Sequence, residues 1–209
     1  MTQSVAIALQ ARETPDLGPE PAREDAERGL IERAKRDPRA YAELYRMHYG
    51  AIAGYLLRRT GDRHVAEDLA SETFLSAWKA LGRFRDRGAP FRAWLMRIAT
   101  NKANRWSRDR KRRSRHATAL GAPATPAEAS ERAGDVQRAL LGLAERDQSV
   151  LVLHHVEGLS VARVADVLGV REGTVKSRLA RARERMRAAL ETTDTQAVTT
   201  GGVSKEVSS

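Results

Sequence analysis

Cations and aromatic rings alternate along residues 83–115 of this sequence. The stretch holds thirteen Arg or Lys residues and only two acids, Asp86 and Asp109. Four rings lie among the cations: Phe84, Phe91, Trp94 and Trp106. Cationic side chains release counterions from phosphates, and aromatic rings stack on unpaired bases. The pattern therefore predicts a surface that holds DNA whose strands are partly separated.

The segment 91–113 reads as one helix with two different faces. One face is mainly apolar: Phe91, Trp94, Leu95, Ile98, Ala99 and Trp106. Such a stripe is more often part of a core than a platform for ligands. The other face mixes amides, a hydroxyl and guanidinium groups: Arg97, Thr100, Asn101, Asn104, Arg105 and Arg108. Groups of this kind read bases while they hold phosphates, and the loop 83–90 before them is suited to receive a flipped base.

A second set of polar side chains follows a short apolar helix near the C-terminal end. Ser160 is placed to cap that helix, and Gly169 to form the turn after it. A short helix, a glycine turn and a longer helix form a helix-turn-helix, which places its second helix in the major groove. The exposed face of that helix is predicted to carry Arg171, Glu172, Thr174, Lys176, Ser177, Arg178 and Arg181. The alternative is an ordinary helical hairpin with a basic face.

The helix expected over 63–81 has an acidic face inside a basic part of the chain. Its core side is formed by small and apolar residues: Ala66, Leu69, Ala70, Thr73 and Ala77. The opposite side carries Glu67, Asp68, Ser71 and Glu72, with Leu75 among them. This face is suited to docking on a basic protein partner. A solvated acidic face is the alternative, and these residues alone leave both open.

The elements that position these side chains are predicted to be all α-helical. No alternation long enough for a strand occurs, and the turn residues divide the chain into two small helical domains with separate cores. Expected helices begin near residue 25 and then cover 38–59, 63–81, 91–113, 135–146, 147–156, 160–168 and 171–190. The domains are expected as a disordered arm (1–26), a helical domain (27–116), a flexible linker (117–133), a second helical domain (134–190) and a disordered tail (191–209).

Composition narrows the class of function. The net charge is +10, and residues 29–116 hold 22 Lys or Arg against 9 Asp or Glu, which favours a localised nucleic-acid surface. There is no Cys, and the five His residues have no ligand spacing with carboxylates, so we expect neither an enzyme nor a cofactor or metal. Apolar runs are too short to span a bilayer, and no signal pattern opens the chain. We therefore expect a cytoplasmic protein with no membrane contact of its own.

Two blocks of the sequence resemble regions of the sigma-70 family of bacterial RNA polymerase sigma factors. Region 2 is similar to DRHVAEDLASETFLSAWKALGRFR and the following APFRAWLMRIATNKANRWSRDRKRR. Region 4 is similar to EGLSVARVADVLGVREGTVKSRLARARERMRAAL. The resemblance covers residues 28–116 and 136–190. With only these two regions and a short linker, the chain resembles the extracytoplasmic-function (ECF) group.

The resemblance implies a function and assigns roles to residues. Such a protein binds core RNA polymerase, recognises the −10 and −35 promoter elements, and melts the DNA. Contact with the clamp coiled coil of the polymerase β′ subunit is implied for Glu67, Asp68, Leu69, Ser71, Glu72, Phe74 and Leu75. Contact with the −10 element is implied for Arg83, Arg85, Arg87, Arg92, Trp94, Arg97, Asn101, Asn104, Arg105 and Arg108. Contact with the −35 element is implied for Arg171, Thr174, Lys176, Ser177, Arg178, Ala180 and Arg181. The segment 136–156 is expected on the polymerase β flap.

Two positions depart from the family pattern, and one further partner is implied by it. Ser71 stands where the family commonly has Gln, and Leu143-Ala144 where it commonly has Leu-Pro, which shifts the start of a helix. Many relatives are held inactive by an anti-sigma factor, so the resemblance implies one as a partner.

The alternative function is a stand-alone helix-turn-helix regulator. Such proteins usually dimerise to match two half-sites, and no dimer stripe is evident here.

Overall fold

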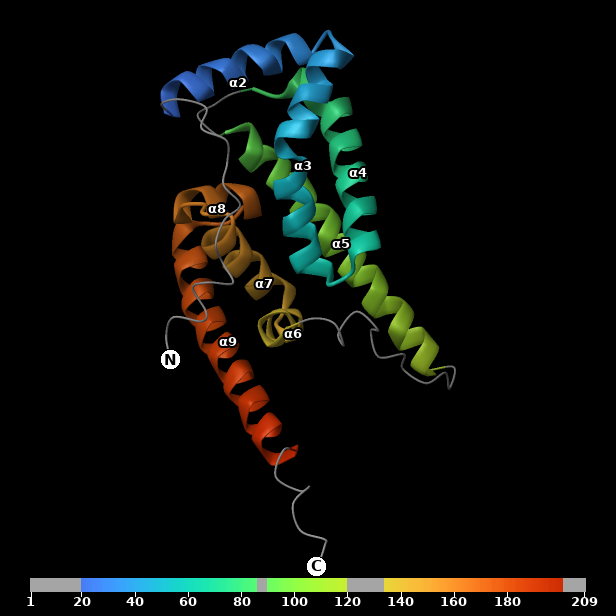
Figure 1. The fold of residues 1–209 in the computed structure, drawn as a ribbon, viewed down its shortest axis with the longest axis vertical. Helices are drawn as coiled ribbons and strands as arrows, with labels where there is room; N and C mark the ends of the chain where they lie inside the picture. Colours follow the sequence, from blue (N-terminus) through green and yellow to red (C-terminus); the bar gives the residue numbers. More distant parts are fainter. Residues whose placement is uncertain (1–19, 86–89, 120–133, 201–209) are drawn as a thin grey trace, which may run out of the picture.

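The first helical unit contains the acidic face and the ring-bearing segment. The computed structural model describes residues 20–85, 90–119 and 134–200. The unit consists of α2 (Glu20–Ala34), α3 (Pro38–Thr60), α4 (Arg63–Ala80), the 3-10 turn η1 (Leu81–Arg83) and α5 (Phe91–Ala119). Helices α3 and α4 form an antiparallel pair, α2 packs on α3, and α5 packs against both members of the pair (Figure 1). The last turns of α5 project beyond the other helices of the unit.

Local turn chemistry explains the hairpin of α3 and α4. Gly61 closes α3 in the left-handed region, with φ of 71°, and its N–H donates to the carbonyl of Leu57. The side chain of Asp62 then accepts from the backbone N–H of Val65 and caps α4. Left-handed backbone favours glycine, and an N-cap favours Asp. These two adjacent residues therefore end one helix and begin the next.

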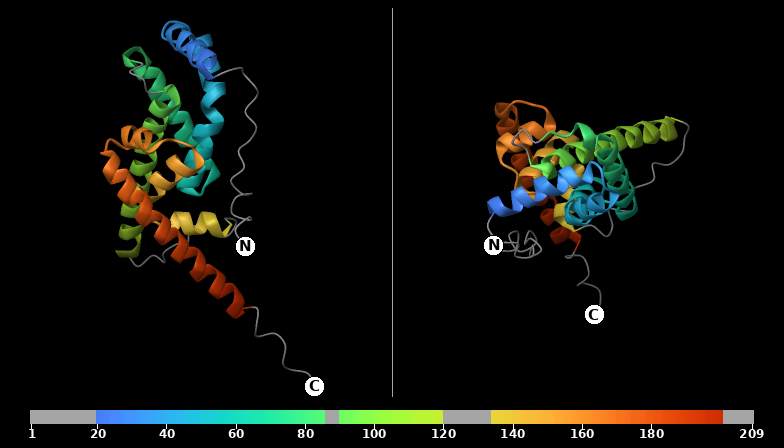
Figure 2. Two further views of the ribbon diagram at one scale, coloured as in Figure 1. Left: turned by 90° about the vertical axis from the view of Figure 1, so that its left-hand side faces the viewer. Right: turned by 90° about the horizontal axis from the view of Figure 1, so that it is seen from above.

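The second helical unit contains the helix-turn-helix. It consists of α6 (Asp135–Gly142), α7 (Glu145–Leu151), the π-helical turn η3 (Val152–Val156), α8 (Val161–Leu168) and α9 (Glu172–Thr200). Ser160 caps α8 by accepting from the N–H of Arg163, and Gly169 ends it with φ of 64°. Helices α6, α7 and α8 pack on α9, whose later turns project away from them (Figure 2). The expected short helix, glycine turn and longer helix are thus present.

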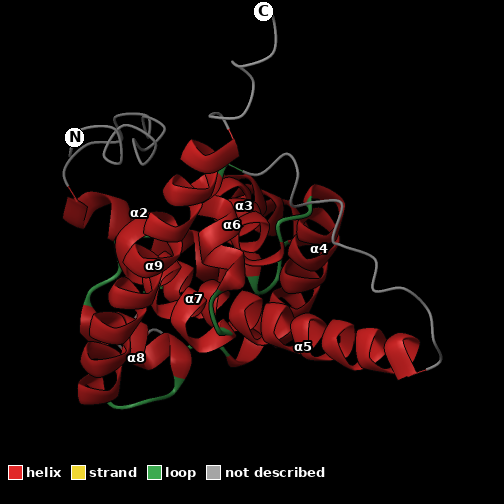
Figure 3. Ribbon diagram, turned by 90° about the horizontal axis from the view of Figure 1, so that it is seen from below, coloured by secondary structure: helices red, strands yellow, loops and turns green. Residues whose placement is uncertain are grey.

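Every regular element within the described residues is helical, which confirms the expected all-α class (Figure 3). Some helix ends differ from expectation. Helix α2 begins inside the segment expected as an arm, and α5 and α9 continue to residues 119 and 200. No Gly or Pro interrupts 191–200, and Gly201 follows directly. The helix expected over 135–146 instead ends at Gly142, because Leu143 and Ala144 adopt extended backbone.

The two units pack against one another. Separate cores were expected, but buried apolar side chains of both units form one continuous cluster. Contacts join α5 to α8 and α3 to α6. The remainder of the expected arm, most of the expected linker, and the end of the expected tail lie outside the described residues. Within the described ranges, no helix is long and apolar enough to cross a bilayer.

Candidate polymerase and nucleic-acid interfaces

The outer side of α4 combines carboxylates with an exposed leucine. Asp68, Ser71, Glu72 and Leu75 are exposed, and Leu75 has 54% of its surface accessible. Glu72 lies 3.0 Å from the ammonium of Lys102 on α5, whereas none of the ion pairs recorded for the described residues involves Asp68. An unpaired carboxylate beside an exposed apolar side chain is suited to binding a cationic protein surface.

Two residues assigned to the polymerase by resemblance face the interior. Leu69 is 8% exposed and Phe74 is 3% exposed. The ring of Phe74 packs on Tyr45, with ring centroids 4.6 Å apart. The remaining member, Glu67, is half-buried and accepts from Arg63 at 2.8 Å. Leu69 and Phe74 therefore support the helix from its core side and do not offer contact area to a partner.

Trp78 extends this face and was missed in the sequence. It is 36% exposed, and its ring lies 4.6 Å from that of Tyr41, centroid to centroid. Its spacing could have indicated this, because Trp78 follows Leu75 by three residues and residues three apart on a helix lie on the same side. Leu75 and Trp78 together form the apolar part of the α4 face.

The polar face of α5 is largely accessible. Arg97, Asn101, Arg105 and Arg108 are exposed, whereas Arg92, Trp94 and Asn104 are half-buried. Thr100, on the same expected face, is buried and bonds to the hydroxyl of Tyr55 at 2.8 Å. Arg83 and Arg85 are exposed before the helix, and Arg87 lies outside the described residues.

The aromatic rings of this region divide between core and surface. Phe84 and Phe91 are buried, so they pack and cannot stack on bases. Trp94 contacts both, with centroids 5.0 and 5.3 Å away, but stays half-buried. The guanidinium of Arg110 lies over the ring of Trp106 at 5.4 Å. Of the four rings, only the two tryptophans retain surface for a base.

The recognition helix α9 and Arg171, the residue before it, carry the seven residues expected at the −35 element. Arg171, Lys176, Ser177, Ala180 and Arg181 are exposed, and Thr174 and Arg178 are half-buried. The opposite side of α9 is fixed by burial of Val175, Leu179 and Ala182. Burial of one stripe therefore orients the hydroxyls and cations of the other stripe outward, as DNA reading requires.

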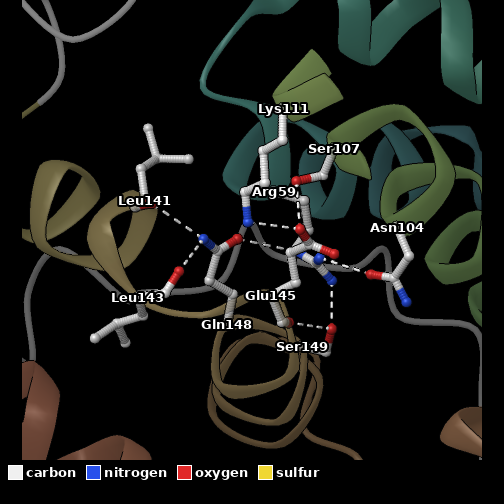
Figure 4. A network of polar contacts seen from close by, with 9 residues as sticks. All are labelled: Arg59, Asn104, Ser107, Lys111, Leu141, Leu143, Glu145, Gln148 and Ser149. Carbon is white, nitrogen blue, oxygen red and sulfur yellow. Dashed lines mark hydrogen bonds and ion pairs between the residues drawn. The ribbon is translucent and has the colours of Figure 1, made fainter. Parts of the chain in front are cut away.

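Arg59 lies at the centre of the junction between the units (Figure 4). It is 4% exposed and donates to the side-chain oxygens of Gln148, 3.3 Å away, and of Ser149, both on α7. It also donates to Asn104 on α5 at 2.9 Å and to the hydroxyl of Tyr55 at 3.1 Å. Arg59 was not predicted from the sequence as a functional residue. The sequence feature that could have indicated its role is its position. Arg59 follows Tyr55 by four residues, so it is a cation on the buried side of an amphipathic helix.

Carboxylates of the second unit pair with cations of the first. Glu145 on α7 accepts from Ser107 and Lys111 of α5, each at 2.8 Å. Burial alone raises the pKa of Glu145, but these two hydrogen bonds and the charges of Lys111 and Arg59 outweigh it, so its pKa is lowered. Glu157, with a side chain 5% exposed, pairs with Arg92.

A cleft of about 600 Å³ opens beside this junction. It is lined from both units by Asn101, Asn104, Arg105, Arg108, Glu145, Arg146, Ser149, Leu168 and Arg178. Four of these residues belong to the set assigned to the −10 element. Part of that set therefore faces the second unit in this arrangement. Within the described residues, no group of three or more His, Cys, Asp or Glu is arranged to hold a metal ion.

Comparison with known proteins agrees with this geometry. The family model for sigma-70 region 2 matches residues 44–113, and that for sigma-70 region 4 matches residues 133–186. The chain is 34% identical to the RNA polymerase sigma-H factor of Pseudomonas aeruginosa, over 80% of this chain and 95% of that protein. It is also 34% identical to the ECF RNA polymerase sigma factor SigL of Mycobacterium tuberculosis, over 65% of this chain and 80% of that protein.

A solved structure gives the same result. The sigma factor RpoE, in its complex with the anti-sigma factor NepR from Bartonella quintana, superposes with a TM-score of 0.60 at 25% identity, covering 72% of this chain and 96% of RpoE. The alternative of a stand-alone helix-turn-helix regulator is not favoured, because the family match includes region 2 as well as region 4. The chain belongs to the sigma-70 family, in its ECF group, and acts in transcription initiation by binding core RNA polymerase and promoter DNA.

Proposed function

We propose that this sigma factor divides its work among three surfaces. The anionic side of α4 binds the clamp coiled coil of the polymerase β′ subunit. The polar side of α5, with the segment before it, melts the −10 element and holds its non-template strand. The outer side of α9 reads the −35 element. The observation that carries this division is the separation of charge. Unpaired Asp68 and exposed Leu75 share the outer side of α4, whereas the cations assigned to DNA lie on α5, on α9 and in the segments just before them.

The polymerase surface is tested by reversing one charge. Asp68→Arg puts a cation where a basic partner is expected, so capture of core polymerase falls while affinity for DNA stays the same or rises. Asp109→Arg is the matched control, since Asp109 is a half-buried acid on α5 whose partner is Arg112. Capture is measured by co-elution of the full chain with core polymerase. Equal loss of capture by both variants contradicts the assignment.

The −35 surface is tested by Lys176→Ala. Lys176 is exposed on α9, so its removal lowers affinity for the upstream element and leaves polymerase capture unchanged. Run-off transcription with core polymerase and a pool of genomic promoters reports the whole function. A complete lack of initiation contradicts the proposal, as does failure of both the Asp68 and Lys176 variants at the same step.

The remaining expectations follow from family membership. RpoE of Bartonella quintana binds an anti-sigma factor, and we infer a partner of this class here, which co-purification from the native host tests. We place the chain in the cytoplasm, where polymerase and promoters meet. The family consists of initiation factors without enzymatic activity, and we infer that promoter opening here is driven by the difference in affinity for duplex and melted strand. We propose that sigma region 2 occupies residues 27–116 and sigma region 4 residues 134–190, inside helical units whose helices α2, α5 and α9 extend beyond these limits.

A further inference from the structure

Arg59 is a buried cation without an acidic partner among the described side chains. Its four acceptors are neutral oxygens, from Tyr55, Asn104, Gln148 and Ser149. Its side chain belongs to none of the ion pairs recorded for the described residues, although its charge helps to lower the pKa of nearby Glu145. Neutral acceptors satisfy the guanidinium N–H groups, but they compensate a buried charge less well than an anion does. The site therefore favours an incoming anionic group.

The position of Arg59 links it to the DNA surface of the first unit. Its guanidinium donates to the side-chain oxygen of Asn104 at 2.9 Å. Asn104 lines the cleft together with Asn101, Arg105 and Arg108, all assigned to the −10 element. Arg59 comes from α3, whereas these residues come from α5. A second helix thus places a buried cation next to this surface.

The second unit supplies half of the hydrogen-bond acceptors that hold this buried cation. Gln148 and Ser149 on α7 provide two of its four acceptors, while Tyr55 and Asn104 belong to the same unit as Arg59. If α7 moves away, Tyr55 and Asn104 still orient the guanidinium, and two sets of N–H donors become free. Glu145 leaves Lys111 in the same movement. An oriented, uncompensated arginine beside amide groups is well suited to a backbone phosphate.

We propose that Arg59 is a further DNA-binding residue of the −10 surface, covered by α7 in this arrangement and exposed when the second unit moves away. Its ligand is a phosphate of the non-template strand. The inference rests on the proposed role of α5 in holding that strand. It adds a residue from another helix to that surface. The same guanidinium would first join the two units and then, after they separate, bind DNA.

The first test uses holoenzyme assembled from core polymerase and the full chain. The probe is a single-stranded oligonucleotide carrying the −10 sequence of a promoter that this holoenzyme transcribes. Arg59→Gln is expected to weaken binding roughly ten-fold. The slope of log affinity against log salt is expected to become shallower by about 0.7, the value for one phosphate contact on a single strand. Arg46→Gln is the matched control, an exposed arginine on α3 about 20 Å along the helix from Arg59.

The second test weakens the junction by changing residues of α7 and leaves Arg59 unchanged. The double variant Glu145→Gln with Ser149→Ala weakens the junction but leaves Arg59 in place, so the isolated chain is expected to bind the oligonucleotide more tightly. Arg59→Gln also weakens the junction, yet it is expected to bind less tightly than the double variant. Arg59→Lys keeps the charge and is expected to retain the salt slope, which separates loss of charge from loss of folding.

The outcomes are distinct. Unchanged affinity and slope for the Arg59→Gln holoenzyme overturn the inference, as does equal tightening by Arg59→Gln and the double variant in the isolated chain. In that case Arg59 only joins the units. Failure of the unmodified holoenzyme to bind the oligonucleotide instead refutes the proposed role of α5, on which the inference depends.

Discussion

Truncation of Leu75 tests whether the α4 face is a binding surface. The side chain is 54% exposed, so roughly half of its area remains to be buried by a partner. Burying a whole leucine side chain is worth about 1.5–3 kcal/mol, so half is worth about 1 kcal/mol. Leu75→Ala is therefore expected to raise the Kd for core polymerase about five-fold. Alanine is the best helix former and Leu75 lies on the surface, so the stability of the chain is expected to change little.

A matched leucine controls for general loss of apolar surface. Leu57 is 42% exposed and belongs to α3, so it is not part of the α4 face. Leu57→Ala is expected to leave the Kd unchanged. The assay is a titration of labelled chain with core polymerase in the absence of DNA. Equal Kd values for Leu75→Ala and the unmodified chain refute the argument, and so does an equal effect of both truncations.

Two further predictions concern the second unit. Leu153 is fully buried, so Leu153→Ala is expected to lower the free energy of unfolding by about 3 kcal/mol, measured by urea titration; a change below about 1 kcal/mol contradicts the packing described. Burial, and then the charges of His154 and Arg183, lower the pKa of His155. The folded chain therefore takes up this proton at lower pH than the unfolded chain, and stability is lost as pH falls below about 6.5. The decline in Tm between pH 7.5 and 5.5 is expected to be smaller in His155→Gln.

Local features of the fold were predictable because local chemistry determines them. Gly61 ends α3 and Asp62 begins α4 through contacts within four residues. Ser160 begins α8 and Gly169 ends it in the same way. Each such position has a backbone or capping requirement that few residue types meet. The extra turns of α9 were not predicted, because the sequence there has no local feature that marks a helix end. No residue in 191–200 stops a helix, and an aperiodic polar segment does not by itself end one.

The candidate surfaces were predictable to the extent that helical periodicity separates faces. Periodicity placed Asp68 and Lys176 outside, where the structure has them. It also placed Leu69 on the core side, whereas family resemblance alone assigned that residue to a partner. The junction was not predictable, because Arg59 and Ser149 are ninety residues apart and their contact depends on how two units pack. No local pattern encodes that arrangement.

The junction predicts weak DNA binding by the isolated chain. A flexible linker alone would make the two DNA surfaces act independently. Here Glu145 and Glu157 already pair with Lys111 and Arg92, so phosphates compete with carboxylates of the same chain. DNA then reaches the covered part of the α5 surface only after the junction opens, and the affinity for that part is reduced by the fraction of open chains.

The salt dependence of DNA affinity distinguishes two models of the isolated chain. In one, junction carboxylates compete with DNA phosphates; in the other, the two DNA surfaces act independently. Added salt weakens phosphate contacts, but it also screens the ion pairs that close the junction. Opening of the junction therefore offsets part of the loss, and the isolated chain is expected to have a shallow salt slope. Glu145→Gln lacks one of these contacts. Its affinity is expected to be higher at low salt and to converge with that of the unmodified chain as salt increases. Parallel lines for the two proteins would show that the junction does not compete with DNA.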